Sequence, residues 1–89
     1  MYYLYILKCA DESLYTGITT DLKRRVAEHN GVGKKGAKYT AARRPVKIVY
    51  SKKFKNRSMA SKKEAEIKSL NRAEKLLIIR AVHKRIGKI

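Results

Sequence analysis

The residue types that could cut a phosphodiester bond are concentrated in the first third of the chain. Two tripeptides, Tyr3-Leu4-Tyr5 and Tyr15-Thr16-Gly17, lie in short stretches of aromatic and β-branched residues, and a helix-like segment with Arg25 and His29 follows at once. An arginine at the border of a small packed sheet is dry enough to hold a phosphate and still open to substrate. These residues favour a phosphodiester-cutting site over a generic basic domain.

A carboxylate stands on the expected apolar face of a later helix. Ala60, Glu64 and Ile67 recur at helical spacing, and Asn71 continues the same row. An acid on an apolar face costs free energy unless it is paired or bound to a cation. Mg²⁺ and Mn²⁺ are commonly held by one or two carboxylates plus phosphate, so Glu64 is a candidate metal ligand. An internal ion pair with Lys68 or with a nearby arginine is the alternative.

Two strands must bring the tyrosines together. Residues 2–8 and 14–19 are rich in strand-forming types, and the turn-like residues 10–13 separate them, so the pattern predicts a β-hairpin. Because side chains alternate along a strand, paired strands can present Tyr5 and Tyr15 in one patch.

A helix should follow the hairpin and carry the arginine. It is expected to begin at residue 20 or 21, where an acidic side chain can cap it, and to end near residues 30–31. Arg25 and His29 are four residues apart, so they lie one above the other on this helix. The alternatives are an ion pair between Arg25 and a neighbouring acid, Asp21 or Glu28, and a helix-end contact for His29.

At this point the chain resembles the GIY-YIG nuclease family. Tyr3-Leu4-Tyr5 and Tyr15-Thr16-Gly17 stand where that family has the two tripeptides of its name. The resemblance continues through residues 21–30, 38–40, 43–46 and 64–68. It covers nearly the whole chain, so the sequence is similar to the small stand-alone members in which the nuclease fold is the entire protein.

The resemblance implies roles for individual residues. Tyr5 would be the general base, with Tyr15 orienting water or phosphate, and Arg25 would bind the scissile phosphate. Glu64 would hold one Mg²⁺ or Mn²⁺ beside the leaving group. The pKa of tyrosine is near 10, so a tyrosine base needs cations that favour the phenolate, and this chain supplies many. His29 completes the expected catalytic set, and the expected substrate contacts are Gly17, Lys38, Tyr39, Thr40 and Arg43.

The middle of the chain should complete the sheet. Residues 31–36 are rich in glycine and lysine and predict a mobile loop, and residues 37–44 predict a short helix. Val46, Ile48 and Tyr50 then alternate with other residues, which predicts a third strand with these three side chains on one face.

The last third should form two helices. Asn71 followed by Glu74 resembles a capping box, so a break is expected there. The expected fold is α+β: a small three-stranded antiparallel sheet flanked by helices, in the order β-β-α-α-β-α-α. We expect one domain over residues 1–89.

Composition indicates the partner. With 23 Lys and Arg against 7 Asp and Glu, the formal net charge of the 89 residues is +16, which attracts a polyanion. The basic residues are spread along the chain and are not confined to one amphipathic helix, so nucleic acid fits better than a membrane surface. DNA is expected ahead of RNA, with a role in DNA repair or processing.

Other classes have less support. Cys9 is the one cysteine, which excludes a disulfide framework or a four-cysteine zinc site within one chain and fits the cytoplasm. The longest apolar run, residues 76–79, is too short to span a bilayer. A binding module of the same fold with little or no catalytic activity remains an alternative, as does an RNA-associated basic protein, although neither needs an inward Glu64.

Overall fold

The structure, a computed structural model, describes residues 1–31 and 38–86, and the side chains of all of these except 38, 39 and 82–86. The described elements are β1 (Tyr2–Lys8), β2 (Leu14–Thr19), α1 (Leu22–His29), α2 (Lys38–Ala41), β3 (Lys47–Phe54), α3 (Arg57–Lys68) and α4 (Arg72–Ile86). This order confirms the expected fold class. The mobile loop expected at 31–36 lies outside the described residues apart from Gly31.

The three strands form one antiparallel sheet in the order β2-β1-β3. As expected, β1 and β2 form a hairpin, in which Tyr5 pairs with Gly17 and Leu7 pairs with Tyr15. The turn is closed by a hydrogen bond from the Cys9 amide to the Ser13 carbonyl, 2.9 Å long. The central strand β1 therefore carries Tyr5 with a partner strand on each side.

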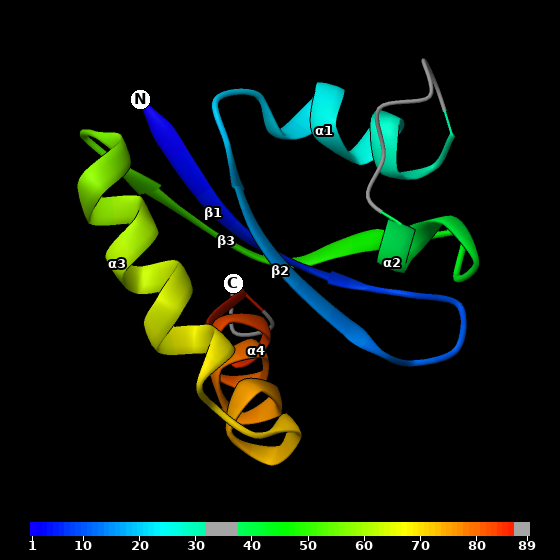
Figure 1. Ribbon diagram of the computed structural model, residues 1–89. Helices are drawn as coiled ribbons and strands as arrows, with labels where there is room; N and C mark the ends of the chain where they lie inside the picture. Colours follow the sequence, from blue (N-terminus) through cyan, green and yellow to red (C-terminus); the bar gives the residue numbers. More distant parts are fainter. Residues whose placement is uncertain (32–37, 87–89) are drawn as a thin grey trace.

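Each face of the sheet has its own apolar core, because successive side chains of β1 point in opposite directions. Tyr5 and Leu7 pack in a cluster under α1, whereas Leu4 and Ile6 pack in a second cluster that α3 and α4 cover. Figure 1 shows α1 and α2 on one side of the sheet and α3 and α4 on the other. The side chains of β1 thus alternate between two packed faces, which places Tyr5 on the face that α1 covers.

The expected alternation along β3 is wrong. Ile6 pairs with Tyr50 and Leu7 pairs with Ile48, so Val49 is an extra residue and forms a bulge. Two residues then oppose one, and the side chains after the bulge change face. Ile48 packs in the Tyr5 cluster, but Tyr50 packs in the Leu4 cluster on the other face. The strand also extends three residues beyond the predicted pattern, which ended at Ser51, to Phe54.

The helix ends follow their capping residues. The Asp21 side chain accepts a hydrogen bond from the Arg24 amide (3.0 Å) at the start of α1, as expected. Asn71 and Glu74 form the predicted capping box, with bonds of 3.0 and 2.9 Å. Asn71 is exposed and lies between α3 and α4, so the expectation that it continues the Ala60 row is wrong. Within the described residues, no helix combines the length and apolarity that a bilayer crossing requires.

Candidate active site

The hydroxyl of Tyr5 is the centre of the candidate site. Tyr5 is 1% exposed and sits on the middle strand, directly opposite Gly17 of β2. A Cβ atom at residue 17 would lie 2.6 Å from the Tyr5 hydroxyl oxygen and 2.7 Å from the ring carbon that carries it. Only glycine leaves room for the phenol, so Gly17 shapes the floor of the site.

A chain of polar contacts runs from Tyr5 into the protein. The Tyr5 hydroxyl lies 2.9 Å from Nε2 of His29, and Nδ1 of the same ring lies 2.7 Å from Oγ1 of Thr40. His29 and Thr40 are both 0% exposed. α1 and α2 thus deliver one side chain each to a buried Tyr5–His29–Thr40 chain, in which every link can pass or orient a proton.

Tyr15 completes an aromatic cluster at the same place. Its ring centroid is 6.4 Å from that of Tyr5 and 5.0 Å from that of His29, which it meets edge to face. These separations are those of favourable aromatic pairs. Unlike Tyr5, Tyr15 is only half-buried. It therefore lies between the buried chain and solvent, where a substrate can reach it.

Arg25 meets the site from α1. Its guanidinium pairs with Glu28, with Nη1 3.1 Å from Oε1, and it also hydrogen bonds Tyr5. Burial alone would lower the pKa of Arg25, but the bonds to Tyr5 and Glu28 raise it overall. The structure thus shows both the ion pair that was the alternative and the proximity to Tyr5 that a phosphate ligand requires.

The two titratable groups of the buried chain are held neutral. Burial raises the pKa of Tyr5, and the nearby Arg25 only partly opposes this. The expectation that cations favour the phenolate holds for Arg25, which lowers the pKa of Tyr5, but desolvation outweighs this effect and the pKa is raised overall. Burial, followed by the charge of Arg25, lowers the pKa of His29 to about 4. A neutral imidazole has one nitrogen that accepts a hydrogen bond, so His29 can accept the Tyr5 proton.

Glu64, on α3, is a half-buried carboxylate whose charge acts on the site. Its side chain is 23% exposed, between the fully buried Ala60 and Ile67, and its charge is close enough to help raise the pKa of Tyr5. Its Oε2 lies 3.4 Å from Nζ of Lys68, so the expected alternative ion pair is present. Lys68 is more than half exposed and its long side chain can turn away. A half-buried carboxylate whose charge acts on Tyr5 is of the chemical type that could hold one Mg²⁺. Among the described residues, no cluster of three or more metal-binding side chains occurs.

The expected substrate contacts divide into inner and outer residues. Gly17 and Thr40 are buried, Gly17 against the Tyr5 ring and Thr40 in its contact with His29. Arg43 is at the surface, where its Nε lies 3.1 Å from Oδ2 of Asp11. The side chains of Lys38 and Tyr39 fall outside the described part of the chain.

Several residues that position the site were not identified from the sequence. Asn30 makes two hydrogen bonds to the backbone of Val46, of 2.8 and 3.1 Å, which tie the end of α1 to the start of β3. Arg44 donates to the His29 carbonyl at 2.8 Å. Glu28, by contrast, was one of the two acids expected as the alternative partner of Arg25, and the structure confirms this ion pair. The contacts of Asn30 and Arg44 join residues that are 15 or more positions apart in the sequence, so no local pattern indicates them.

Residues 1–76 match the GIY-YIG catalytic domain, and the chain belongs to the GIY-YIG nuclease family. It is similar to small proteins designated UPF0213. One from Natronomonas pharaonis is 54% identical over 74 residues, which cover 83% of this chain and 85% of that protein. One from Syntrophus aciditrophicus is 51% identical over 78 residues, 88% of each chain.

Solved structures agree with this assignment. The solution NMR structure of a UPF0213 protein from Bacillus halodurans is 41% identical, with a TM-score of 0.58 over 91% of this chain and 85% of that one. A protein from E. faecalis is 43% identical, with a TM-score of 0.62 over 92% and 85%. Family membership implies a nucleic acid substrate, and nucleases of this family generally depend on a divalent metal.

Proposed function

We propose that this protein is a Mg²⁺-dependent nuclease that hydrolyses phosphodiester bonds in DNA. The observation that carries the proposal is the convergence of Arg25, His29 and the charge of Glu64 on the buried hydroxyl of Tyr5. Three elements, α1, α3 and β1, supply these groups. A core that needed only to be stable would gain nothing from placing a cation, a carboxylate and a neutral histidine around one phenol.

Arg25 is the phosphate ligand in this proposal. Its planar, permanently charged fork suits the oxygens of a phosphoryl group. A phosphate would compete with Glu28 and Tyr5 for the guanidinium, and the Tyr5 hydroxyl would lose one of its two partners. Neutralising Arg25 would also remove the second cause of the low His29 pKa, so substrate binding makes His29 a better proton acceptor.

Tyr5 and His29 act together as the general base. The attacking water gives a proton to the Tyr5 oxygen while the Tyr5 proton passes to Nε2 of His29. This requires the tautomer in which Nδ1 carries the hydrogen and donates it to Thr40. The water oxygen bonds to phosphorus, and the bond from phosphorus to the 3′ oxygen breaks. Tyr15, at the open side of the cluster, orients the water or the phosphate.

Glu64 holds the metal in this proposal. When bound, the ion neutralises charge on the phosphoryl and leaving oxygens. The protein's own contribution is one carboxylate oxygen, and Lys68 must release that oxygen first. We place the protein in the cytoplasm as a single-domain enzyme of DNA repair or processing.

A catalytically weak nucleic-acid-binding module of the same fold is the second candidate. The raised pKa of Tyr5 and the ion pair between Glu64 and Lys68 favour the binding module. A neutral Tyr5 and a paired Glu64 are not in the states that catalysis requires. The two candidates differ in one property, which is Mg²⁺-dependent cleavage.

The test is a cleavage screen with single-stranded, duplex, flap and branched DNA and matched RNA, in Mg²⁺ or in EDTA. We expect Mg²⁺-dependent cuts in at least one DNA substrate. Arg25→Ala should lower cleavage at least about 100-fold with little change in binding. Arg24→Ala is the matched control, because Arg24 contacts Glu28 from the exposed side of the same helix. Equal losses in the two variants, or no cleavage by the wild type, would refute the proposal.

A further inference from the structure

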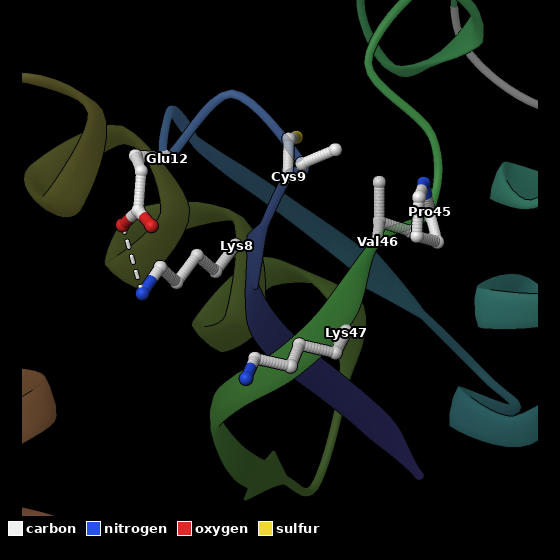
Figure 2. Close-up of a pocket in the computed structure, with 7 residues that line it drawn as sticks. Lys8, Cys9, Glu12, Pro45, Val46 and Lys47 are labelled. Carbon is white, nitrogen blue, oxygen red and sulfur yellow. Dashed lines mark ion pairs between the residues drawn. The ribbon is translucent and has the colours of Figure 1, made fainter.

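A second basic region lies at the end of the sheet that holds the β1–β2 turn. Three adjoining hollows of about 370, 210 and 220 Å³ open there, and neighbouring hollows share lining residues. Figure 2 shows the largest, with Lys8 and Lys47 extending from adjacent strands and Glu12 paired with Lys8. We call this region the distal groove.

Two of its cations are forced together by the strand register. Lys8 at the end of β1 and Lys47 at the start of β3 are direct partners in the antiparallel ladder. Like charges placed opposite each other on paired strands are destabilising. The unfavourable pair has one acidic neighbour in the turn, Glu12, whose Oε2 lies 2.8 Å from Nζ of Lys8.

α4 adds two more cations. Arg72, at the start of this helix, lines both hollows that border Leu14, and Lys75 lines one of them. Cations are unfavourable at a helix N-terminus, where the helix dipole is positive, so the positions of Arg72 and Lys75 do not stabilise α4. They extend the basic region from the strand ends to α4.

One carboxylate, Glu12, interacts with three of these four cations. The pKa of Glu12 is lowered first by its hydrogen bond to Lys8 and the charge of that lysine, and then by the charges of Arg72 and Lys47. Among the described residues that line the three hollows, Glu12 is the only acid. Positive charge is therefore left uncompensated in a concave region, which is the electrostatic pattern of a phosphate-binding surface.

The distal groove is separate from the tyrosine site. Lys8 is three residues beyond Tyr5, about 10 Å along the strand, and its side chain faces the opposite side of the sheet. Tyr5, Tyr15, Arg25, His29 and Glu64 do not line the hollows, although Cys9 and Val46 of the largest hollow pack in the Tyr5 cluster. A ligand here would not touch the reacting phosphate.

From this geometry we infer that the distal groove binds the phosphodiester backbone of the nucleic acid substrate away from the bond that is cut. Backbone phosphates contact Lys8, Lys47 and Arg72 and displace Glu12 from them. The inference rests on nucleic acid being the substrate. It assigns to Glu12 the role of an internal anion that weakens binding.

The test measures binding without cleavage. Anisotropy of labelled single-stranded and duplex oligonucleotides in EDTA gives affinity as a function of salt. Replacing both Lys47 and Arg72 by Gln should reduce the slope of log affinity against log salt by about 1.4 to 1.8 units, the loss of two phosphate contacts. The control replaces Lys55 and Lys62, two exposed lysines that line none of the hollows, and should leave the slope nearly unchanged.

A second variant predicts the opposite sign. Glu12→Gln should tighten binding several-fold. Its matched control is Glu66→Gln, because Glu66 is as exposed as Glu12 (64% against 66%) and also pairs with one lysine. Equal effects within each pair of variants would overturn the inference, and so would competition by inorganic phosphate at low millimolar concentration, since the free ion would then be the ligand. If the wild type cuts nothing but these differences appear, the proposed function fails and the distal groove stands.

Discussion

His29 shows how strongly burial away from water changes the pKa of a single residue in this site. Its pKa is lowered from 6.5 to about 4, first by burial and then by the charge of Arg25. At a pH between about 4 and 6.5, His29 is protonated in the unfolded chain and neutral in the folded protein, so the unfolded chain binds more protons. The stability that neutral His29 contributes is therefore complete above pH 6.5 and is lost as the pH falls through about 4.

This predicts a measurable pH effect. The free energy of unfolding of the wild type should fall with decreasing pH in that window, with up to about 1.4 kcal/mol per pH unit due to His29. His29→Gln should lack this component while keeping the titration of every other group. Urea unfolding at a series of pH values measures the difference. Superimposable profiles would mean that His29 is not held neutral.

Gly17 carries the second prediction at the scale of residues. Gly17→Ala should displace the Tyr5 ring, because the new methyl group would meet the hydroxyl at 2.6 Å. Overpacking of this kind costs about 1 to 3 kcal/mol. We expect a lower melting temperature together with loss of cleavage, since the Tyr5–His29 contact is broken.

Gly31→Ala is the control for Gly17→Ala. Gly31 has φ +105°, so alanine there is strained, and its neighbour is the guanidinium of Arg44, which bonds the His29 carbonyl, and not Tyr5 itself. It should cost stability with much less effect on cleavage. If the two variants lost cleavage equally, the close approach of Gly17 and Tyr5 would not be what matters.

At the scale of elements, α1 is held in place by its last turn. The two hydrogen bonds between Asn30 and Val46, one donated by each residue, set where α1 ends against β3, and His29 is the adjacent residue. Asn30→Ala should destabilise the protein by about 1 to 3 kcal/mol and reduce cleavage, because His29 is no longer fixed. Asn71→Ala removes a cap from α4, far from the tyrosines, and should cost about 1 kcal/mol with cleavage unchanged. Thermal melting and cleavage rates measured on both variants check this.

The elements that could be predicted are those with local causes. The hairpin follows from two strand-forming stretches and a turn, the start of α1 follows from Asp21, and the start of α4 follows from the Asn71–Glu74 capping box. The bulge at Val49 could not be predicted, because it depends on how β3 pairs with β1. The sequence pattern there is compatible with simple alternation.

Part of the candidate site could likewise be predicted from local patterns and part could not. The side chains of Tyr5, Tyr15 and Arg25 were expected together because strand alternation and helical spacing place them. The contact between His29 and Thr40 joins two different helices, so no local sequence pattern indicates it. The direction of the Tyr5 pKa shift also needed the structure, since net charge alone says nothing of burial.

For the whole molecule, the excess of positive charge is the dominant property. With a formal charge of +16 on 89 residues, binding to nucleic acid should be driven by release of counterions from phosphates. The slope of log affinity against log salt should be negative, with a magnitude above about 2. Titration at several salt concentrations tests this, and a flat response would remove the electrostatic account of binding.

The central claim concerns Glu64, and one comparison tests it most directly: single-turnover cleavage against Mg²⁺ concentration for the wild type, Glu64→Gln and Lys68→Gln. Glu64→Gln should abolish Mg²⁺-dependent cleavage while nucleic acid binding is kept and the melting temperature changes little, because the pair with Lys68 is partly exposed. Lys68→Gln removes the same ion pair but leaves the carboxylate, so it should cut at least as well as the wild type. If Glu64→Gln melts well below the wild type and still cuts at the wild-type rate, Glu64 is a structural residue and the proposed metal site is wrong.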